Sequence, residues 1–219
     1  MRLSAVHNSR VTFLIEIAEL TPFGKVHPPT LLNALAKRCD FKNFPENLGK
    51  EPKPQAFVFE GGLWNKQPIT KLSLFNDGIA LDTGSSTEDT ETTLLELLEW
   101  AKRDLGLAFE PAMVRRKMLL SQLVFYMEGR LDSVHPIFGE MEKVLSQSTS
   151  ENLNHPFSYR IASVQLSPNP LDAKFLPGLF SIERRADTPD SENKYFSTAP
   201  VHTKEHLALL ERFERSIRK

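Results

Sequence analysis

The sequence predicts an α+β protein made of two tandem halves, each with the order strand, helix, three strands, helix. Several short segments alternate apolar and other side chains, as strands with one buried face do. Other segments repeat apolar residues every three or four positions, which is typical of helices. Because both kinds of segment recur in the same order, we expect one half at residues 1–110 and the other at residues 111–219.

The first half begins with alternation at residues 11–17, which predicts a strand. A helix is expected at residues 30–39, because two prolines precede it and proline costs nothing in a first helical turn. The remaining elements of this half are strands at residues 56–60, 70–75 and 79–82 and a helix that ends near Leu105. Ser85 or Ser86 is expected to cap that helix, with acidic residues in its first turn.

The turn between the third and fourth strands is expected at Asn76-Asp77-Gly78. Asp-Gly favours a tight hairpin, because it adopts the positive φ angles that match strand twist.

The second half repeats this order. Its expected elements are strands at residues 118–128, 159–166, 179–185 and 195–199, a helix opened by His135-Pro136, and a last helix with Thr203 as its N-cap. At one constant offset, residues 11–16 align with residues 123–128, and residues 97–99 align with residues 209–211. A duplication explains this agreement, and a coincidence of common helix and strand patterns is the alternative.

Two such halves are able to pair their edge strands across a pseudo-twofold axis. The result is one antiparallel sheet with four helices on one face. The order of elements is similar to that of the TATA-binding protein. This likeness is an analogy of fold that implies no function, because no residue motif of that family is present.

Composition limits the classes of function. The net charge is −1, so the whole molecule lacks the general attraction for phosphate backbones, although local basic clusters remain. The single cysteine, Cys39, excludes a disulfide within the chain. The N-terminal segment is charged and fits neither a signal peptide nor a membrane span. We therefore expect a cytoplasmic protein with no membrane partner.

One short motif suggests catalysis. Asp82-Thr83-Gly84 matches the tripeptide of aspartic proteases, in which two carboxylates share a proton. The aligned part of the second half has no acid, and a helix follows Ser86 where the protease continues into a strand. A strand end followed by a helix cap explains these residues instead.

The histidines and the cysteine give no complete site. His202 and His206 have the spacing of a metal-binding pair, but a helix that starts at Thr203 leaves His202 outside it, and no third ligand is nearby. Cys39 has no histidine beside it in sequence. We expect no metal, no cofactor and no catalytic residue.

The sheet face opposite the helices is the more informative feature, because it is too apolar to be covered by water alone. Its predicted apolar side chains are Leu14, Phe75, Val124, Tyr126, Tyr159, Ile161 and Leu179. Either the long segments at residues 40–54 and 167–178 fold over this face, or a protein partner or second copy covers it. The folding segments would use Phe41, Phe44, Phe175 and Leu176.

The leading hypothesis is therefore a non-catalytic binding or assembly module that acts through this apolar face. A second hypothesis is nucleic-acid binding by the aromatic residues Phe75, Tyr126 and Tyr159 together with Arg184 and Arg185. A third is a hydrolase-like enzyme with Asp82 and either His202 or His206 in a groove between the halves.

Overall fold

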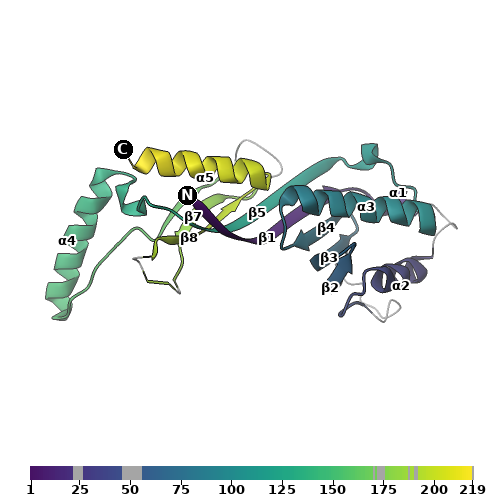
Figure 1. Ribbon diagram of the computed structural model, residues 1–219, viewed down its shortest axis with the longest axis horizontal. Helices are drawn as coiled ribbons and strands as arrows, with labels where there is room; N and C mark the ends of the chain where they lie inside the picture. The colour runs from purple at the N-terminus through teal and green to yellow at the C-terminus, as the bar shows by residue number, and fades with distance from the viewer. Residues whose placement is uncertain are drawn as a thin grey trace. The chain divides into compact units, whose positions relative to one another are not determined.

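The computed structural model describes residues 1–21, 27–45, 56–169, 171, 176–186, 188–189 and 192–218. Within these residues the chain forms one eight-stranded antiparallel sheet and five α-helices, so the predicted α+β class is confirmed (Figure 1). The strand order in the sheet is β2-β3-β4-β1-β5-β8-β7-β6.

The elements also follow the predicted order along the chain. The first set is β1 (Arg2–Leu14), α1 (Ile17–Leu20), α2 (Pro28–Arg38), β2 (Ala56–Trp64), β3 (Gln67–Phe75), β4 (Gly78–Thr83) and α3 (Thr87–Leu105). The second set is β5 (Arg116–Tyr126), α4 (Pro136–Leu153), β6 (Ser163–Leu166), β7 (Phe180–Arg184), β8 (Lys194–Ala199) and α5 (Thr203–Ile217). Two 3-10 turns, η1 (Pro111–Met113) and η2 (Leu131–Ser133), and the single-turn helix α1 are additions to the predicted order.

Several predicted ends are wrong. β1 starts nine residues earlier than residue 11 and ends at Leu14, so Ile17 begins α1 instead of ending a strand. β6 is shorter than the predicted strand at residues 159–166. Thr203 is the first residue of α5 rather than the cap before it.

The β3–β4 turn lies at the predicted place, but Gly78 does not supply the positive φ angle that the prediction assigned to it. Gly78 is already part of β4 and pairs with Phe75, and neither Asp77 nor Gly78 has a positive φ. A Cβ atom on Gly78 would lie 2.9 Å from the carbonyl oxygen of Phe13 and 3.3 Å from Leu14 Cδ2. The glycine therefore permits close approach of β1.

The chain divides into two compact units. Unit 1 comprises residues 1–5, 122–199 and 204–219, and unit 2 comprises residues 6–121 and 200–203. Each unit therefore includes a short piece of the other half of the sequence.

Unit 2 has a core between one sheet face and the helices α1, α2 and α3. Val11 pairs with Leu81, and Leu81 pairs with Leu72, so the three side chains share one face. All three belong to the hydrophobic core, together with Leu94 and Leu97 of α3. The Ser86 hydroxyl caps α3 by accepting from the Asp89 amide at 3.0 Å, as predicted.

Unit 1 has a core between α5 and the strands β5, β7 and β8. The fully buried side chains include Phe125, Ile182, Tyr195 and Leu210. The Phe125 and Tyr195 rings lie 5.9 Å apart. Ser197 on β8 contacts His206 on α5, which identifies this sheet face as the one covered by α5.

Candidate interaction surface

The predicted binding residues fall in several places. In unit 2, Leu14 and Phe75 are both cross-strand partners of Gly78, so they lie on one sheet face, opposite the core. Phe75 is exposed and Leu14 is half-buried. The prediction that places these two side chains on the same face is confirmed.

Two segments, residues 40–54 and 167–178, were expected to cover this face, and only parts of them belong to the described residues. Phe41 is buried in the core of unit 2, where its ring lies 5.3 Å from that of Phe59. Phe44 and Leu176 are exposed, and Phe175 lies outside the described residues. Phe41 therefore stabilises the helix side of the sheet rather than the other side.

Tyr126 lies at the end of β5 in unit 1, between two cations. The Arg2 guanidinium lies 4.3 Å above its ring, and the Lys194 ammonium lies 5.8 Å from it. Lys194 and Phe196 alternate along β8 with the buried Tyr195 and Ser197, so they face away from α5. This side of unit 1 is mixed in character, because aromatic rings lie among charges.

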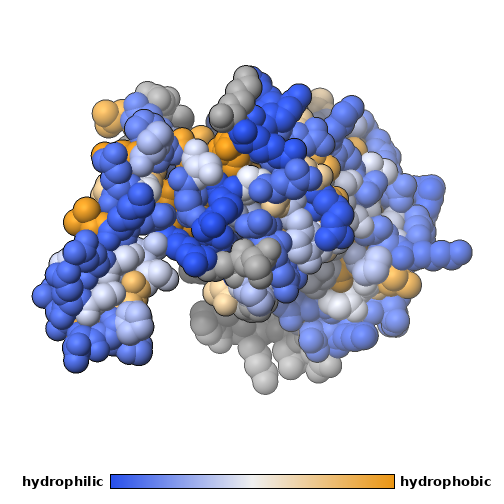
Figure 2. All heavy atoms as spheres, turned by 60° about the vertical axis from the view of Figure 1, so that its left-hand side comes forward, coloured by the Kyte–Doolittle hydropathy of each residue, from blue (hydrophilic) through white to orange (hydrophobic). Residues whose placement is uncertain are grey.

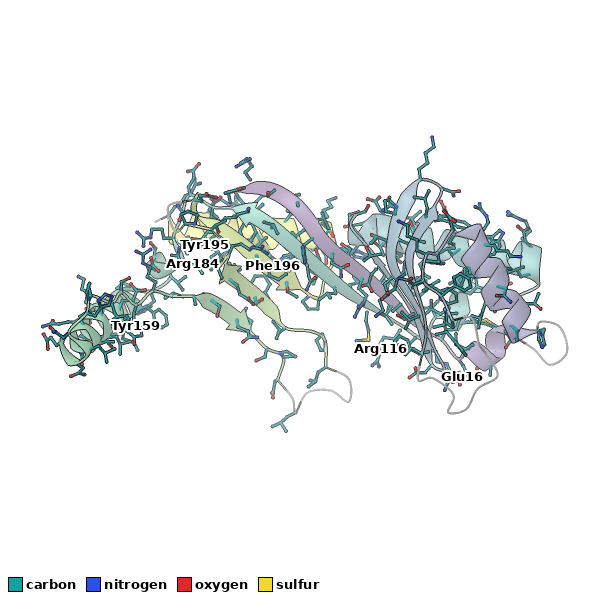
Figure 3. All side chains as sticks on the ribbon, turned by 90° about the horizontal axis from the view of Figure 1, so that it is seen from below. Glu16, Arg116, Tyr159, Arg184, Tyr195 and Phe196 are labelled. Carbon is teal, nitrogen blue, oxygen red and sulfur yellow. The ribbon has the colours of Figure 1, made fainter. Side chains whose placement is uncertain are left out.

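Arg184 does not lie on that surface. It pairs in register with Tyr195, and its guanidinium lies 5.6 Å from the Tyr195 ring (Figure 3). Its Nη2 donates to both carboxylate oxygens of Asp132 at 3.2 Å, and its Nε donates to the Ile161 carbonyl at 3.1 Å. Arg185 follows β7 and donates its backbone N–H to the Lys194 carbonyl.

Tyr159 and Ile161 are also absent from the sheet, because the chain there runs back along α4. Tyr159 N–H donates to Ser146 Oγ at 2.8 Å, and Ile161 N–H donates to Glu142 Oε1 at 3.0 Å. Figure 3 shows Tyr159 beside α4, apart from Arg184 and Tyr195. Leu179 lies just before β7 and is exposed.

These contacts define a projecting part of unit 1, residues 135–161, which we call the arm. Pro136 occupies the first turn of α4, and His135 Nδ1 accepts from the Ile137 amide at 3.2 Å, so the helix start is capped. The helix ends at Leu153, and the following Asn154 has a φ of +48°. Phe157 N–H then donates to Ser150 Oγ, which fastens the returning segment of the arm to the helix.

The arm exposes an apolar stripe. None of the 18 residues of α4 is buried. Five apolar side chains, which we call the stripe, recur at helical spacing and are 41% to 68% exposed: Ile137, Phe138, Met141, Val144 and Leu145. At 100° per residue, Glu142, Ser146 and Ser150 lie on another side of the helix. Because the returning segment binds that other side, the stripe is uncovered.

Figures 1 and 2 show the surroundings of α4. Within unit 1, α4 stands apart from the strands and from α5 (Figure 1). Hydrophobic side chains are exposed among hydrophilic ones on the side of the molecule that carries α4 (Figure 2).

The catalytic candidates have structural partners. Asp82 is buried and accepts from Arg10 Nε at 2.7 Å and Arg10 Nη2 at 2.9 Å. Thr83 Oγ1 lies 2.6 Å from Thr90 Oγ1 and accepts from the Ser85 amide. The Asp-Thr-Gly segment thus links a strand end to the first turns of α3.

The histidines are engaged separately. His206 is fully buried, and burial lowers its pKa to about 4. Ser197 Oγ donates its proton to the Ser181 carbonyl at 2.6 Å and therefore accepts from His206 Nε2 at 2.8 Å. His202 lies 3.4 Å from Thr87 Oγ1. A serine whose proton is held by a backbone carbonyl, beside a histidine out of reach of solvent, is not arranged as a nucleophile.

A reciprocal pair of threonines was missed by the sequence reasoning. Both belong to unit 2. The Thr87 amide donates to Thr203 Oγ1 at 2.9 Å, and the Thr203 amide donates to Thr87 Oγ1 at 2.7 Å. Each amide begins a helix and would otherwise lack a partner. The available signal was that both threonines occupy the same place in the order of elements.

The cysteine thiol and the possible metal ligands offer little reactivity. Burial raises the pKa of the Cys39 thiol to about 12, so the thiolate is scarce at neutral pH. Among the residues that the structure describes, no three His, Cys, Asp or Glu side chains form a metal site, and no helix has the length and hydrophobicity to cross a membrane.

Unit 2 also holds an apolar cavity of ≈ 70 Å³ between its helices and its sheet. Its lining includes Ile17, Leu20, Leu31, Leu35, Leu94 and Leu97. Such a lining provides no acid, base or nucleophile.

No family model matches the chain, and no curated protein matches it.

Proposed function

We propose that the protein is a non-catalytic binding or assembly module that engages a protein through the arm. The observation that carries this proposal is the uncovered stripe on α4. Most helices in proteins gain their stability by packing an apolar face against another element. Burial of one large apolar side chain contributes roughly 1.5 to 3 kcal/mol, so covering the stripe supplies a substantial driving force.

This proposal relocates the binding surface from the sheet to the arm. Leu14 and Phe75 belong to unit 2, and Tyr126 lies among charges in unit 1. Tyr159 is the one predicted aromatic residue that belongs to the arm, where it is 44% exposed. Apolar surface is concentrated on α4 rather than on the open sheet face.

The partners of Asp82, His202 and His206 support a non-catalytic role over the hydrolase hypothesis. Asp82 neutralises Arg10, and His206 supports a buried serine. Nucleic-acid binding is less well supported, because Arg184 is paired with Asp132 and the Tyr126 ring already stacks with Arg2.

Affinity capture from native host extract, followed by mass spectrometry, tests the proposal. Val144→Asp places a charge in the stripe, at a side chain that is 68% exposed and so not needed for the fold. Gln147→Asp adds the same charge on the hydrophilic side of α4 and is the matched control. We expect Val144→Asp to remove partners that the wild type and Gln147→Asp retain.

The same partners on all three proteins would contradict a role for the stripe. Titration with a single-stranded oligonucleotide at about 50 and about 200 mM salt tests the nucleic-acid alternative. Salt-sensitive binding that Val144→Asp leaves intact and Tyr126→Ala weakens would favour that alternative.

A further inference from the structure

In unit 2, the helix that holds the same position in the order of elements as α4 is packed on the sheet. This helix, α2, follows the long strand β1 and precedes three strands. The α2 side chains Leu32, Leu35 and Ala36 are buried in the core that also contains Phe59 of the edge strand β2. Phe59 is completely buried.

Among the residues of unit 1 that the structure describes, no helix covers the edge strand β6 in this way. α4 follows the long strand β5 and precedes β6, β7 and β8. In β6, Leu166 pairs with Phe180, whose ring contacts the ring of His206 on α5 at 6.1 Å. Leu166 therefore lies on the side of the sheet that α5 covers, yet it is 64% exposed. We call Val164 and Leu166, the two β6 side chains on this side, the β6 seat.

One chain thus has an uncovered apolar helix and an uncovered apolar seat. In unit 2 the corresponding helix and strand bury each other. The two surfaces in unit 1 match in kind, since both are apolar and one is a helix stripe while the other is a sheet edge.

The anchors of the arm argue against closure onto the seat of the same chain. Arg184 binds the chain on both sides of α4: Asp132 precedes the helix, and Ile161 follows it. The Arg184 amide also donates to the Ala162 carbonyl at 2.9 Å. In addition, Leu131 is completely buried. The two ends of the arm are therefore held together at the end of β7, and α4 stands apart from the strands of unit 1 (Figure 1).

We propose that the arm packs its stripe on the β6 seat of a second copy, and that the two copies exchange arms reciprocally. This inference rests on the proposed function and names the partner of the same surface. Exchange of an identical element between two protomers gives a closed twofold dimer with two equal contacts.

Light scattering across a range of concentrations provides the first test. We expect a dimer for the wild type and for Gln147→Asp, and a monomer for Val144→Asp and for Leu166→Asp. Circular dichroism establishes that each variant is folded. A monomeric wild type at every concentration would overturn the exchange.

Cross-linking with a short bis-maleimide tests the geometry. Copies with Val144→Cys and copies with Leu166→Cys carry tags of different size and are mixed. Cys39 is completely buried and its thiol pKa is raised to about 12, so it should be spared. We expect a covalent dimer that contains one copy of each size.

Two cross-linking results contradict the exchange. A cross-link within one chain of the double variant would mean that the arm closes on its own seat. A cross-link only between two Val144→Cys copies would mean that two arms pair with each other.

The outcome also separates the two proposals. Suppose that the wild type is a monomer and that Val144→Asp still loses partners captured from host extract. This result would overturn the proposal that a second copy is the partner, and it would support the proposed function. If the wild type is a monomer and Val144→Asp captures the same partners as the wild type, both the exchange of arms and the proposed function would be overturned.

Discussion

The Arg184 guanidinium lies 3.2 Å from both carboxylate oxygens of Asp132, and this pair fastens the base of the arm. Burial acts to raise the pKa of Asp132, but the charges of Arg184 and Arg130 outweigh it and hold the pKa below its usual value. The interaction is therefore made by the ionised carboxylate. It joins η2 to the end of β7.

Arg184→Ala should lower the free energy of unfolding by about 2 kcal/mol, because it removes a charged partner of the half-buried Asp132 and the donor to the Ile161 carbonyl. Urea unfolding measures this loss. A double-mutant cycle with Asp132→Ala isolates the pair, and strictly additive losses would contradict a direct interaction.

The buried His206 predicts acid sensitivity. Its pKa is about 4 in the folded protein and near 6.5 in the unfolded chain, so the unfolded state binds the extra proton between these values. Its contribution to stability is complete above pH 6.5 and falls as the pH drops toward 4. The loss is about 3 kcal/mol, as an order of magnitude.

His206→Gln keeps a donor for Ser197 and removes the titration. We expect its free energy of unfolding, measured by urea at several pH values, to change much less between pH 6.5 and pH 4. His27→Gln, at an exposed histidine, is the control. If His206→Gln retained the wild-type pH dependence, burial of His206 would not be its cause.

The reciprocal threonine pair predicts a hydroxyl-specific effect. Thr203→Val keeps the shape of the side chain but leaves the buried Thr87 amide without its acceptor. An unsatisfied buried donor costs roughly 1 to 3 kcal/mol. Thr203→Ser restores the hydroxyl and should stay close to wild type, which thermal unfolding can check. A larger loss for Thr203→Ser than for Thr203→Val would point to packing of the methyl group instead.

Asp82 is expected to contribute to stability and to no reaction. Asp82→Asn should destabilise the protein by about 1 to 3 kcal/mol, since it removes the charge that receives Arg10. Arg10→Ala should have a similar effect, and the double variant should lose less than the sum. Any peptide hydrolysis that disappears with Asp82→Asn and survives in Arg10→Ala would restore the enzyme hypothesis.

Gly78 and Gly84 give a matched pair of substitutions. Gly78→Ala brings Cβ to 2.9 Å from the Phe13 carbonyl oxygen and should cost about 1 to 3 kcal/mol of strain. Gly84 has no atom within 4 Å of the corresponding position, so Gly84→Ala should be neutral or stabilise by up to about 1 kcal/mol. Chemical denaturation of both variants tests the contrast, and equal effects would refute it.

The sequence predicted strands and helices where their periodicity is clear. Val11 and Phe13 stand two residues apart in one strand, Leu81 stands two residues after Ile79 in another, and each is buried on the expected face. Tyr159 and Ile161 alternate in the same way, yet they lie along α4 because Ser146 and Glu142 accept their amide protons. Local alternation does not distinguish a strand from an extended segment bound to helix side chains.

The candidate site was less predictable, because it depends on which partner each group finds. In the sequence, Arg184 looks like part of a basic surface cluster. In the structure its charge is neutralised by Asp132, which lies 52 residues away along the chain. The stripe of α4 looks like an ordinary core face until its surroundings are known.

The sequence by itself therefore determined the class, the order of elements and the helix-facing side of the first strands. These features follow from periods of two and 3.6 residues, which are local properties of the backbone. Only the tertiary structure decided that the apolar face of α2 is buried and that of α4 is exposed, since burial depends on surfaces far apart in the chain.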